Sequence, residues 1–323
     1  MRRKTGLAAV LSTIVLLGCT QAFAWGAKGH QIVAYVGSQL TNAQSAPFWS
    51  SNSEGLRQLS TVPDRLWKRA ATYKGEAPTH WFQADAYVAV GGDLGSFPKT
   101  YGSAVSQYSE ATILKNGTAL WRISQFYDDA VNALRSGDVK SAVEFAGLMT
   151  HYVGDLSQPL HVSENYDGVQ SGQKGIHAWF ETKNIEDEMA IRDVVTQRAQ
   201  ALLADSNFVN QFTGDMMDIA EKEAMRALAY RDAILQNDLQ YGRTSAKASR
   251  IQLELAEDRM ADGAASLAII LSKISADAGQ VIRATPAPIQ DPSWIAPDYS
   301  SGNRLMTPLF ESASDREDDC DLE

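Results

Sequence analysis

Residues 151–161 of the chain read HYVGDLSQPLH. If this stretch begins on a helix, His151 and Asp155 share one face, because residues four apart are neighbours along a helix. Pro159 should end that helix, since proline cannot continue its hydrogen-bond ladder. The turn that follows can bring His161 back toward the same point. The stretch therefore predicts a helix end where two imidazoles and a carboxylate converge, as they do in many metal sites.

The rest of the chain is mainly helical in its hydrophobic pattern, and strand signals are sparse. We expect helices over residues 31–40, 120–134, 139–153, 177–191, 208–237 and 246–276. Residues 83–104 are rich in Gly and Ala and should form an irregular loop. These features predict a mostly α protein with a single main domain over residues 25–283.

Further metal-donor residues lie on both sides of the opening stretch. His177 and Glu181 repeat the spacing of four, whereas Asp64 and His80 occupy loop-like contexts next to prolines. One such pair alone is more often a hydrogen-bonded surface pair, and one Asp after Pro is usually a turn or cap. Their joint occurrence favours a metal cluster. Nitrogen and oxygen donors without cysteine suit zinc.

The first 24 residues resemble a secretory signal. Basic residues 2–4 precede an apolar run over 7–17, and Ala22-Phe-Ala24 forms a small-x-small cleavage site. The apolar run is too short to favour a membrane-spanning helix. Cleavage after Ala24 would expose the amine of Trp25, which could chelate a metal together with its own carbonyl oxygen and His30. We therefore expect a secreted or periplasmic protein. An alternative is lipidation at Cys19 in the LLGC sequence, which would leave Trp25 internal.

The composition limits the partners of the chain. Its formal net charge of −10 argues against unaided long-range attraction to polyanions, although a cationic metal cleft can still bind phosphate locally. Only Cys320 would remain after cleavage, so no internal disulfide is expected. Residues 284–323 are rich in Pro, Ser and Asp, and we expect a mobile acidic tail there.

From Trp25 to about Ile185, the chain resembles a superfamily of metal-dependent hydrolases. This superfamily contains the bacterial zinc-dependent phospholipases C and the single-strand-specific zinc nucleases of plants and fungi. The resemblance rests on Trp25 at the expected mature terminus, on the His-x-x-x-Asp-x-x-x-Pro-x-His run from His151, and on the later spacing of His177 and Glu181. It implies a mostly helical fold around a cleft with three zinc ions.

The resemblance also implies a ligand set for each ion. The first zinc would be held by Asp64, His80, His151 and Asp155. The second would be held by His161, His177 and Glu181, with open water positions. The third would be held by Trp25, His30 and a shared Asp155. Asp64 would also accept the proton of the attacking water, which makes it the expected catalytic residue.

Some motifs indicate a nuclease and others a phospholipase. The start from Trp25 to His30 and the Trp121-Arg122-Ile123 stretch resemble the nucleases, whereas Glu181 as the last acid resembles the phospholipases. Nucleases usually carry an Arg three residues after the first Asp and an acid three residues after the second His. This chain has Trp67 and Gln83 at those positions, with Arg65 and Lys68 near the first and Asp85 near the second.

These departures give a slight preference for phospholipase C-type cleavage of phospholipid head groups. The alternatives are a single-strand-specific endonuclease or 3′-nucleotidase, and a non-catalytic binding protein stabilised by metal. Trp81 and Phe82 could stack a base, line a lipid pocket or belong to the core, and Arg65 could contact the phosphate. The partner would be a phospholipid head group or the phosphate of a single-stranded nucleic acid or nucleotide. We expect a monomer.

Overall fold

A computed structural model describes residues 25–68, 71–89, 92–279 and 286–287, without the side chains of residues 71–75. The expected leader, Cys19, Cys320 and nearly all of the expected tail lie outside these residues. Every regular element of the described part is a helix, so the prediction of a mostly α fold is confirmed. Among these helices, none is both long and apolar enough to cross a membrane.

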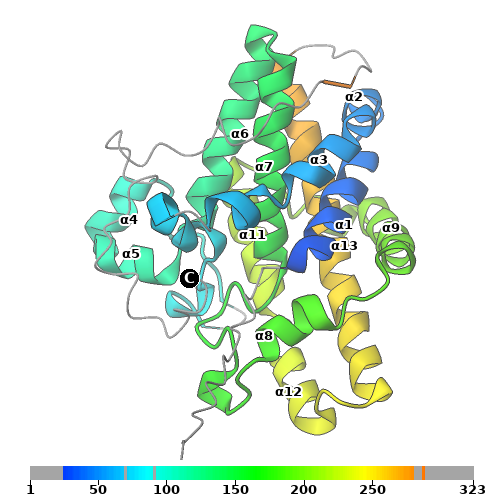
Figure 1. Cartoon of the computed structure of the whole chain (residues 1–323). Helices are drawn as coiled ribbons and strands as arrows, with labels where there is room; N and C mark the ends of the chain where they lie inside the picture. The colour runs from blue at the N-terminus through cyan, green and yellow to red at the C-terminus, as the bar shows by residue number, and fades with distance from the viewer. Residues whose placement is uncertain (1–24, 69–70, 90–91, 280–285, 288–323) are drawn as a thin grey trace, which may run out of the picture.

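Four helices form the centre of the molecule (Figure 1). They are α1 (Gly26–Gln39), α6 (Ala119–Ser136), α7 (Val139–Ser157) and α13 (Ala246–Ala278). Gly137 ends α6 in the left-handed conformation, and Asp138 caps α7 by accepting a hydrogen bond from the Ser141 amide at 3.1 Å. This short connection makes α6 and α7 an antiparallel hairpin, against which α1 and α13 pack.

The other α-helices surround this centre (Figure 1). They are α2 (Ala46–Ser51), α3 (Ser53–Leu59), α4 (Tyr101–Tyr108), α5 (Glu110–Asn116), α8 (Ile176–Ala178), α9 (Glu188–Ala204), α10 (Ser206–Val209), α11 (Met216–Leu228) and α12 (Arg231–Tyr241). Helices α3 and α9 lie against α1, whereas α11 packs on α6 and α7. The donor-bearing end of α7 is therefore enclosed on several sides.

Two of the expected long helices are interrupted. Residues 208–237 are divided among α10, α11 and α12. Gly214 with its positive φ separates α10 from α11, which starts after Asp215 with a capping box to Asp218. The prediction of a single helix over 177–191 is also wrong. There α8 runs into a π-helical turn, η5 (Trp179–Lys183), and α9 begins only at Glu188.

Candidate metal centre

Five parts of the fold converge on one buried site. They are α1, the π-helical turn η1 (Pro63–Trp67), the end of the 3₁₀ segment η2 (Ala71–His80), the end of α7 with its following turn, and the α8–η5 segment. Pro159 acts as expected, since α7 ends at Ser157 and the chain turns to bring His161 back. The site contains all eight expected donor side chains, each at most 7% exposed: His30, Asp64, His80, His151, Asp155, His161, His177 and Glu181.

The donor atoms fall into three groups, in each of which they lie within 4.8 Å of one another. The groups are His30, Asp64 and His151; His80, His151 and Asp155; and His161, His177 and Glu181. The last group coincides with the set expected for the second zinc, and the middle group contains three of the four ligands expected for the first. Three donors can hold one ion that keeps open positions, but His151 belongs to two of the groups and its Nε2 can bind the ion of only one of them.

Asp155 lies between the groups. Its Oδ1 is 3.4 Å from the Nε2 of His30, and its Oδ2 is 3.4 Å from the Nε2 of His151. A carboxylate can use its two oxygens for two ions, so this position suits the shared ligand that the resemblance implies. Gly154 makes the arrangement possible, because a Cβ there would lie 2.8 Å from the Nδ1 of His30.

Four of the imidazoles are oriented by backbone carbonyl groups. The Nδ1 of His80 lies 3.0 Å from the Glu76 carbonyl oxygen, and that of His151 lies 2.7 Å from the Ser60 carbonyl oxygen. The Nδ1 of His161 lies 2.6 Å from the His80 carbonyl oxygen, and that of His177 lies 3.2 Å from the Tyr166 carbonyl oxygen. A carbonyl only accepts, so each Nδ1 must carry the proton. The Nε2 of each neutral ring is then a lone-pair donor that faces the site, as a metal ligand requires.

The electrostatics of the site favour neutral imidazoles. Burial, reinforced by the nearby Lys68 ammonium, holds the pKa of His80 well below its usual value. Burial and the neighbouring His30 do the same to the pKa of His151. Burial also lowers the pKa of His161. These rings therefore remain available to a cation over a wide pH range.

The pKa values of the Asp155 and Glu181 carboxyl groups are shifted in opposite directions. Burial, followed by the charge of Asp64, raises the pKa of Asp155 well above its usual value. Burial would also raise the pKa of Glu181, but His177 and His161 together lower it to about 2. The Nε2 of His177 lies 2.9 Å from Oε2 of Glu181. Glu181 is thus ionised beside its two imidazoles, whereas the charge of Lys68 does not offset the effects of burial and Asp64 on Asp155.

Several donor atoms are buried without a hydrogen-bond partner in the described part of the chain. They are the Nε2 atoms of His80 and His151, both carboxylate oxygens of Asp155 and Oε1 of Glu181. Each such group costs about 1–3 kcal/mol when left unsatisfied. Because these atoms face one another, bound cations would satisfy them together. The donor set fits divalent metal, and its N and O composition suits zinc.

Trp25 also lies at this site. Its fully buried indole donates to the Ser157 hydroxyl at 2.9 Å, and its ring contacts that of Phe180. Its carbonyl oxygen accepts the His30 amide at 3.3 Å, which leaves the second lone pair of that oxygen. The Trp25 backbone therefore starts α1 beside His30. Chelation by its amine and carbonyl remains a prediction.

Comparison with known proteins gives the family of the chain. Residues 25–276 match the model of the S1/P1 nuclease family. The chain belongs to the S1/P1 nuclease family. The matched region begins at Trp25 and includes all nine expected ligands.

More distant similarities accompany this family assignment. A probable serine protease of Bradyrhizobium tropiciagri is 25% identical over 193 residues, and the match covers 41% of this chain but only 24% of that protein. The alpha-toxin of Clostridium absonum (TM-score 0.43, 14% identity) and that of an avian strain of Clostridium perfringens (TM-score 0.47, 18% identity) are similar solved structures. In each case the similarity covers 80% of this chain and 65% of the toxin.

The three side chains expected to contact substrate occupy different environments. Trp81 follows His80 directly and is partly exposed, with its indole fixed by a hydrogen bond to the Lys115 carbonyl at 3.2 Å. Phe82 is fully buried and packs against Tyr87 and Phe97, so it belongs to the core. Arg65 is exposed on η1, next to Asp64. Trp81 and Arg65 are thus the accessible candidates.

Trp67 stands where nucleases usually carry an Arg, and the structure places a different cation near Asp64. Trp67 is buried and stacks on Phe126, whereas the next residue, Lys68, extends its Nζ to 3.8 Å from Oδ1 of Asp64. In the π-helical turn η1, a residue four positions on lies near the same face as Asp64. Lys68 therefore supplies a buried positive charge at the centre.

Asp85 is engaged by three donors of the protein. Its carboxylate accepts hydrogen bonds from Arg231 at 2.7 Å, from the Ser163 hydroxyl at 2.8 Å and from the Glu164 amide at 2.8 Å. These bonds join the segment after His80 to the segment after His161. The position two residues earlier, Gln83, is almost fully buried. Asp85 is therefore a structural acid.

Several residues that support the ligands were not predicted from the sequence. Gln158 donates to Oε2 of Glu181 at 3.0 Å, and Glu76 orients His80 through its carbonyl oxygen. Gln158 could have been suspected, since a polar residue at a helix end lies between two ligands in the opening stretch. Glu76 could have been suspected only from its position four residues before His80.

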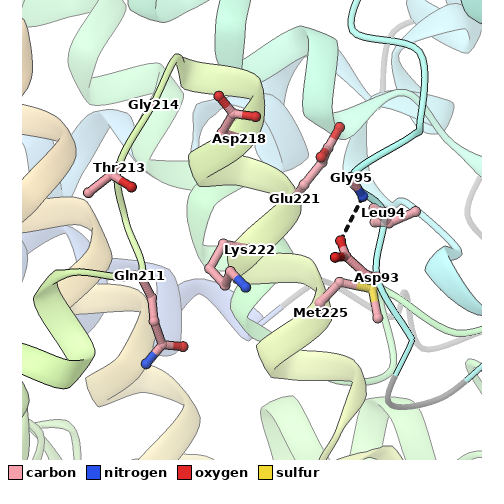
Figure 2. Close-up of a pocket in the computed structure, with 10 residues that line it drawn as sticks. All are labelled: Asp93, Leu94, Gly95, Gln211, Thr213, Gly214, Asp218, Glu221, Lys222 and Met225. Carbon is pink, nitrogen blue, oxygen red and sulfur yellow. Dashed lines mark hydrogen bonds between the residues drawn. The ribbon is translucent and has the colours of Figure 1, made fainter.

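A separate pocket of about 360 Å³ lies along α11 (Figure 2). Its lining includes Asp93, Asp218 and Glu221, but no ligand of the metal centre. Lys99 donates to Asp218 and Glu221 at 2.8 and 2.7 Å, and Asp93 accepts the Gly95 amide at 2.7 Å. Its acids are therefore compensated mainly within the protein, unlike those of the metal centre.

Proposed function

We propose that the protein is a zinc-dependent hydrolase that cleaves phosphodiester bonds in single-stranded nucleic acid or nucleotides. Family membership gives the class of enzyme, a phosphodiester hydrolase. The observation that carries the proposal is the convergence of three buried donor groups, in which the Nε2 atoms of His80 and His151 and both oxygens of Asp155 have no hydrogen-bond partner among the described residues. A non-catalytic binding protein would need closed coordination at each ion, but His161, His177 and Glu181 supply only three donors to theirs.

In this proposal each ion keeps the ligand set that the resemblance implies. His161, His177 and Glu181 hold the second ion. Asp64, His80, His151 and Asp155 hold the first. Trp25, His30 and Asp155 hold the third. When bound, zinc supplies hydroxide at neutral pH and neutralises charge that develops on the phosphate oxygens.

Asp64 is the proposed proton acceptor. Its Oδ1 lies 3.5 Å from the Nε2 of His80 and 3.8 Å from that of His151, at the centre of the donor atoms. A buried carboxylate at this point can orient an attacking water and take up its proton. Packing fixes the position of Asp64, since the residue is only 4% exposed.

Lys68 and Arg65 are the proposed phosphate contacts. The centre has three carboxylates, so three divalent cations leave an excess of positive charge, to which the buried Lys68 ammonium adds. Such an arrangement is stable only with an anion nearby, and a phosphate group meets this need. The exposed Arg65 can guide the same phosphate from the rim.

Trp81 is the proposed platform for a base. Stacking of a base on an aromatic ring contributes about 1–3 kcal/mol, and the bond to Lys115 keeps the Trp81 ring in place before binding. The family match changes the preference that the motifs alone gave, from phospholipid to nucleic acid. A phospholipase C-type activity remains the second candidate because Glu181, rather than Asp, completes the second donor group.

We also propose that the mature protein begins at Trp25 and acts outside the cytoplasm. The family match begins at this residue, and the preceding sequence has the pattern of a secretory signal. Mass measurement of the mature N-terminus tests this. A chain that starts at Cys19 with bound lipid would contradict it.

The test of the substrate is parallel hydrolysis by the zinc-loaded mature protein. The substrates are denatured single-stranded DNA and phosphatidylcholine vesicles. Cleavage of DNA without release of diacylglycerol is the expected result. Release of diacylglycerol alone would replace the nuclease with the phospholipase, and turnover of neither substrate by a zinc-loaded protein would favour the non-catalytic alternative.

A further inference from the structure

We propose that Glu76, Tyr152 and Arg122 form a buried positioning network that holds His80 in the orientation needed to bind the first metal ion. The inference rests on the metal centre of the proposed function but not on the identity of its substrate. None of the three residues belongs to the expected ligand set. All three side chains are fully buried.

Glu76 contacts His80 through the backbone. Its carbonyl oxygen accepts the Nδ1 proton of His80 at 3.0 Å, and the Thr79 hydroxyl donates to the same carbonyl at 2.6 Å. The orientation of the His80 ring therefore depends on where the peptide group of Glu76 lies. A rotation of this peptide would remove the acceptor and turn the Nε2 atom away from the site.

The side chain of Glu76 fixes that peptide. One carboxylate oxygen accepts from Arg122 on α6 at 3.0 Å, and the other accepts from the hydroxyl group of Tyr152 on α7. The hydroxyl group of Thr79 reaches the second oxygen as well, at 3.0 Å. Segment η2 is thus attached to both helices of the central hairpin through one carboxylate.

Tyr152 also contacts the ligands directly. Its ring meets that of His80 edge-on, with centroids 5.5 Å apart, and that of His151 with centroids 5.2 Å apart. The Arg122 guanidinium lies 5.8 Å from the centroid of the Tyr152 ring and 5.6 Å from that of Phe126. One buried side chain therefore lies behind two of the ligands expected for the first ion.

The chemistry of the network favours a positioning role over a purely stabilising one. A buried ion pair is often no more stable than apolar residues of the same volume, because both charges lose their hydration. A Glu76–Arg122 pair adds no net charge behind the ligands, yet it gives the carboxylate a fixed direction. Loss of such outer partners typically costs about 10–100-fold in metal affinity.

The test compares two removals of a tyrosine hydroxyl. Tyr152→Phe removes the bond to Glu76, whereas the control Tyr127→Phe removes the bond of Tyr127 to Asp277, which joins α6 to α13 and involves no expected ligand. Zinc that remains bound is counted by elemental mass spectrometry after equilibration with increasing chelator. Tyr152→Phe should release one ion at a chelator strength about 10-fold lower than wild type, and Tyr127→Phe should not. The ion released should be the one that His80→Ala lacks.

The midpoint of unfolding of the metal-free protein separates positioning from structure. It should fall no more in Tyr152→Phe than in Tyr127→Phe. Equal zinc retention by the two variants, or equal weakening of all ions by Tyr152→Phe, would overturn the inference. Glu76→Gln should weaken the same ion further if it folds. A wild-type protein that binds zinc but cleaves neither substrate would refute only the proposed function, whereas one that binds no zinc would refute both.

Discussion

Two buried charged regions of this molecule are built in opposite ways. Between α11 and α13, Asp262 is fully buried and pairs with Arg226 at 3.0 Å and Arg259 at 3.2 Å. In the metal centre, Asp155 is equally buried, but its oxygens face the imidazoles of His30 and His151 instead. The first region contains its own cations, whereas the second provides donors for cations from outside.

The difference identifies the part of the protein whose stability depends on a ligand. The guanidinium groups near Asp262 are also covered by aromatic rings, with Arg259 3.7 Å from the Tyr230 centroid and Arg226 4.7 Å from that of Phe208. Such a network needs no bound ion to compensate its carboxylate. Of the buried cations described near the metal centre, Arg122 is paired with Glu76, which leaves Lys68 beside the ligands. The carboxylates and imidazoles of the centre should therefore separate or take up protons without metal.

Removal of metal should have the largest effect. A strong chelator should abolish hydrolysis of the substrate and lower the free energy of unfolding by several kcal/mol, because bound ions stabilise only the folded protein. Calorimetry with and without added zinc measures the loss. Amide hydrogen exchange should increase around η1, η2 and η5 but remain slow where α11 meets α13. Uniform loss of protection in both regions would contradict the comparison.

Extension of the mature N-terminus tests one ion of the metal centre. A single residue added before Trp25 converts its amine into an amide, which binds zinc poorly. We expect the extended protein to bind two ions instead of three and to lose at least ~100-fold in activity, since each ion contributes several kcal/mol to the transition state. Mass spectrometry under native conditions counts the ions. An extended protein as active as the authentic one would exclude the third zinc.

The sequence predicted the convergence of the donor residues better than it predicted the residues that orient them. Convergence of His151, Asp155 and His161 followed from helix geometry and from one proline. The bond between Glu76 and Tyr152 joins residues 76 positions apart, and no local pattern encodes it. Arg122 was noted only as part of a family-like stretch.

The same limit applies to the fold. The long helices α6, α7 and α13 have regular apolar faces, and their predicted ends were within a few residues of those observed. Short helices such as α2, α3 and α5 are stabilised mainly by tertiary packing, so their own sequences indicate them weakly. The break before α11 depends on Gly214 and the Asp215 cap, which the continuous apolar pattern of 208–237 concealed.

Loss of the Asp262 carboxylate should damage the other region without affecting metal. Asp262→Asn leaves two buried guanidinium groups without their anion, which typically costs about 3–5 kcal/mol. Urea unfolding of the zinc-loaded protein measures this change. The number of bound zinc ions in the folded variant should equal that of wild type. A loss of zinc would mean that the two regions are coupled, contrary to the comparison.

Glu223, on α11 near Asp262, should produce an effect that depends on pH. Burial, followed by the charge of Asp262, raises the pKa of Glu223 from 4.5 to about 8. Between these values the folded protein holds a proton that the unfolded chain has released, so the free energy of unfolding should fall as pH rises through this window. Glu223→Gln keeps the shape but cannot ionise. Its stability relative to wild type should therefore increase from pH 4.5 to 8, by at most about 1.4 kcal/mol per pH unit, and then level off. Urea unfolding of both zinc-loaded proteins at pH 5 and pH 8.5 cancels the pH dependence of the metal centre, which they share. If the free energies of unfolding of the two proteins differ by the same amount at both pH values, Glu223 is ionised throughout. The arginines near Asp262 would then compensate the charge of Glu223 as well.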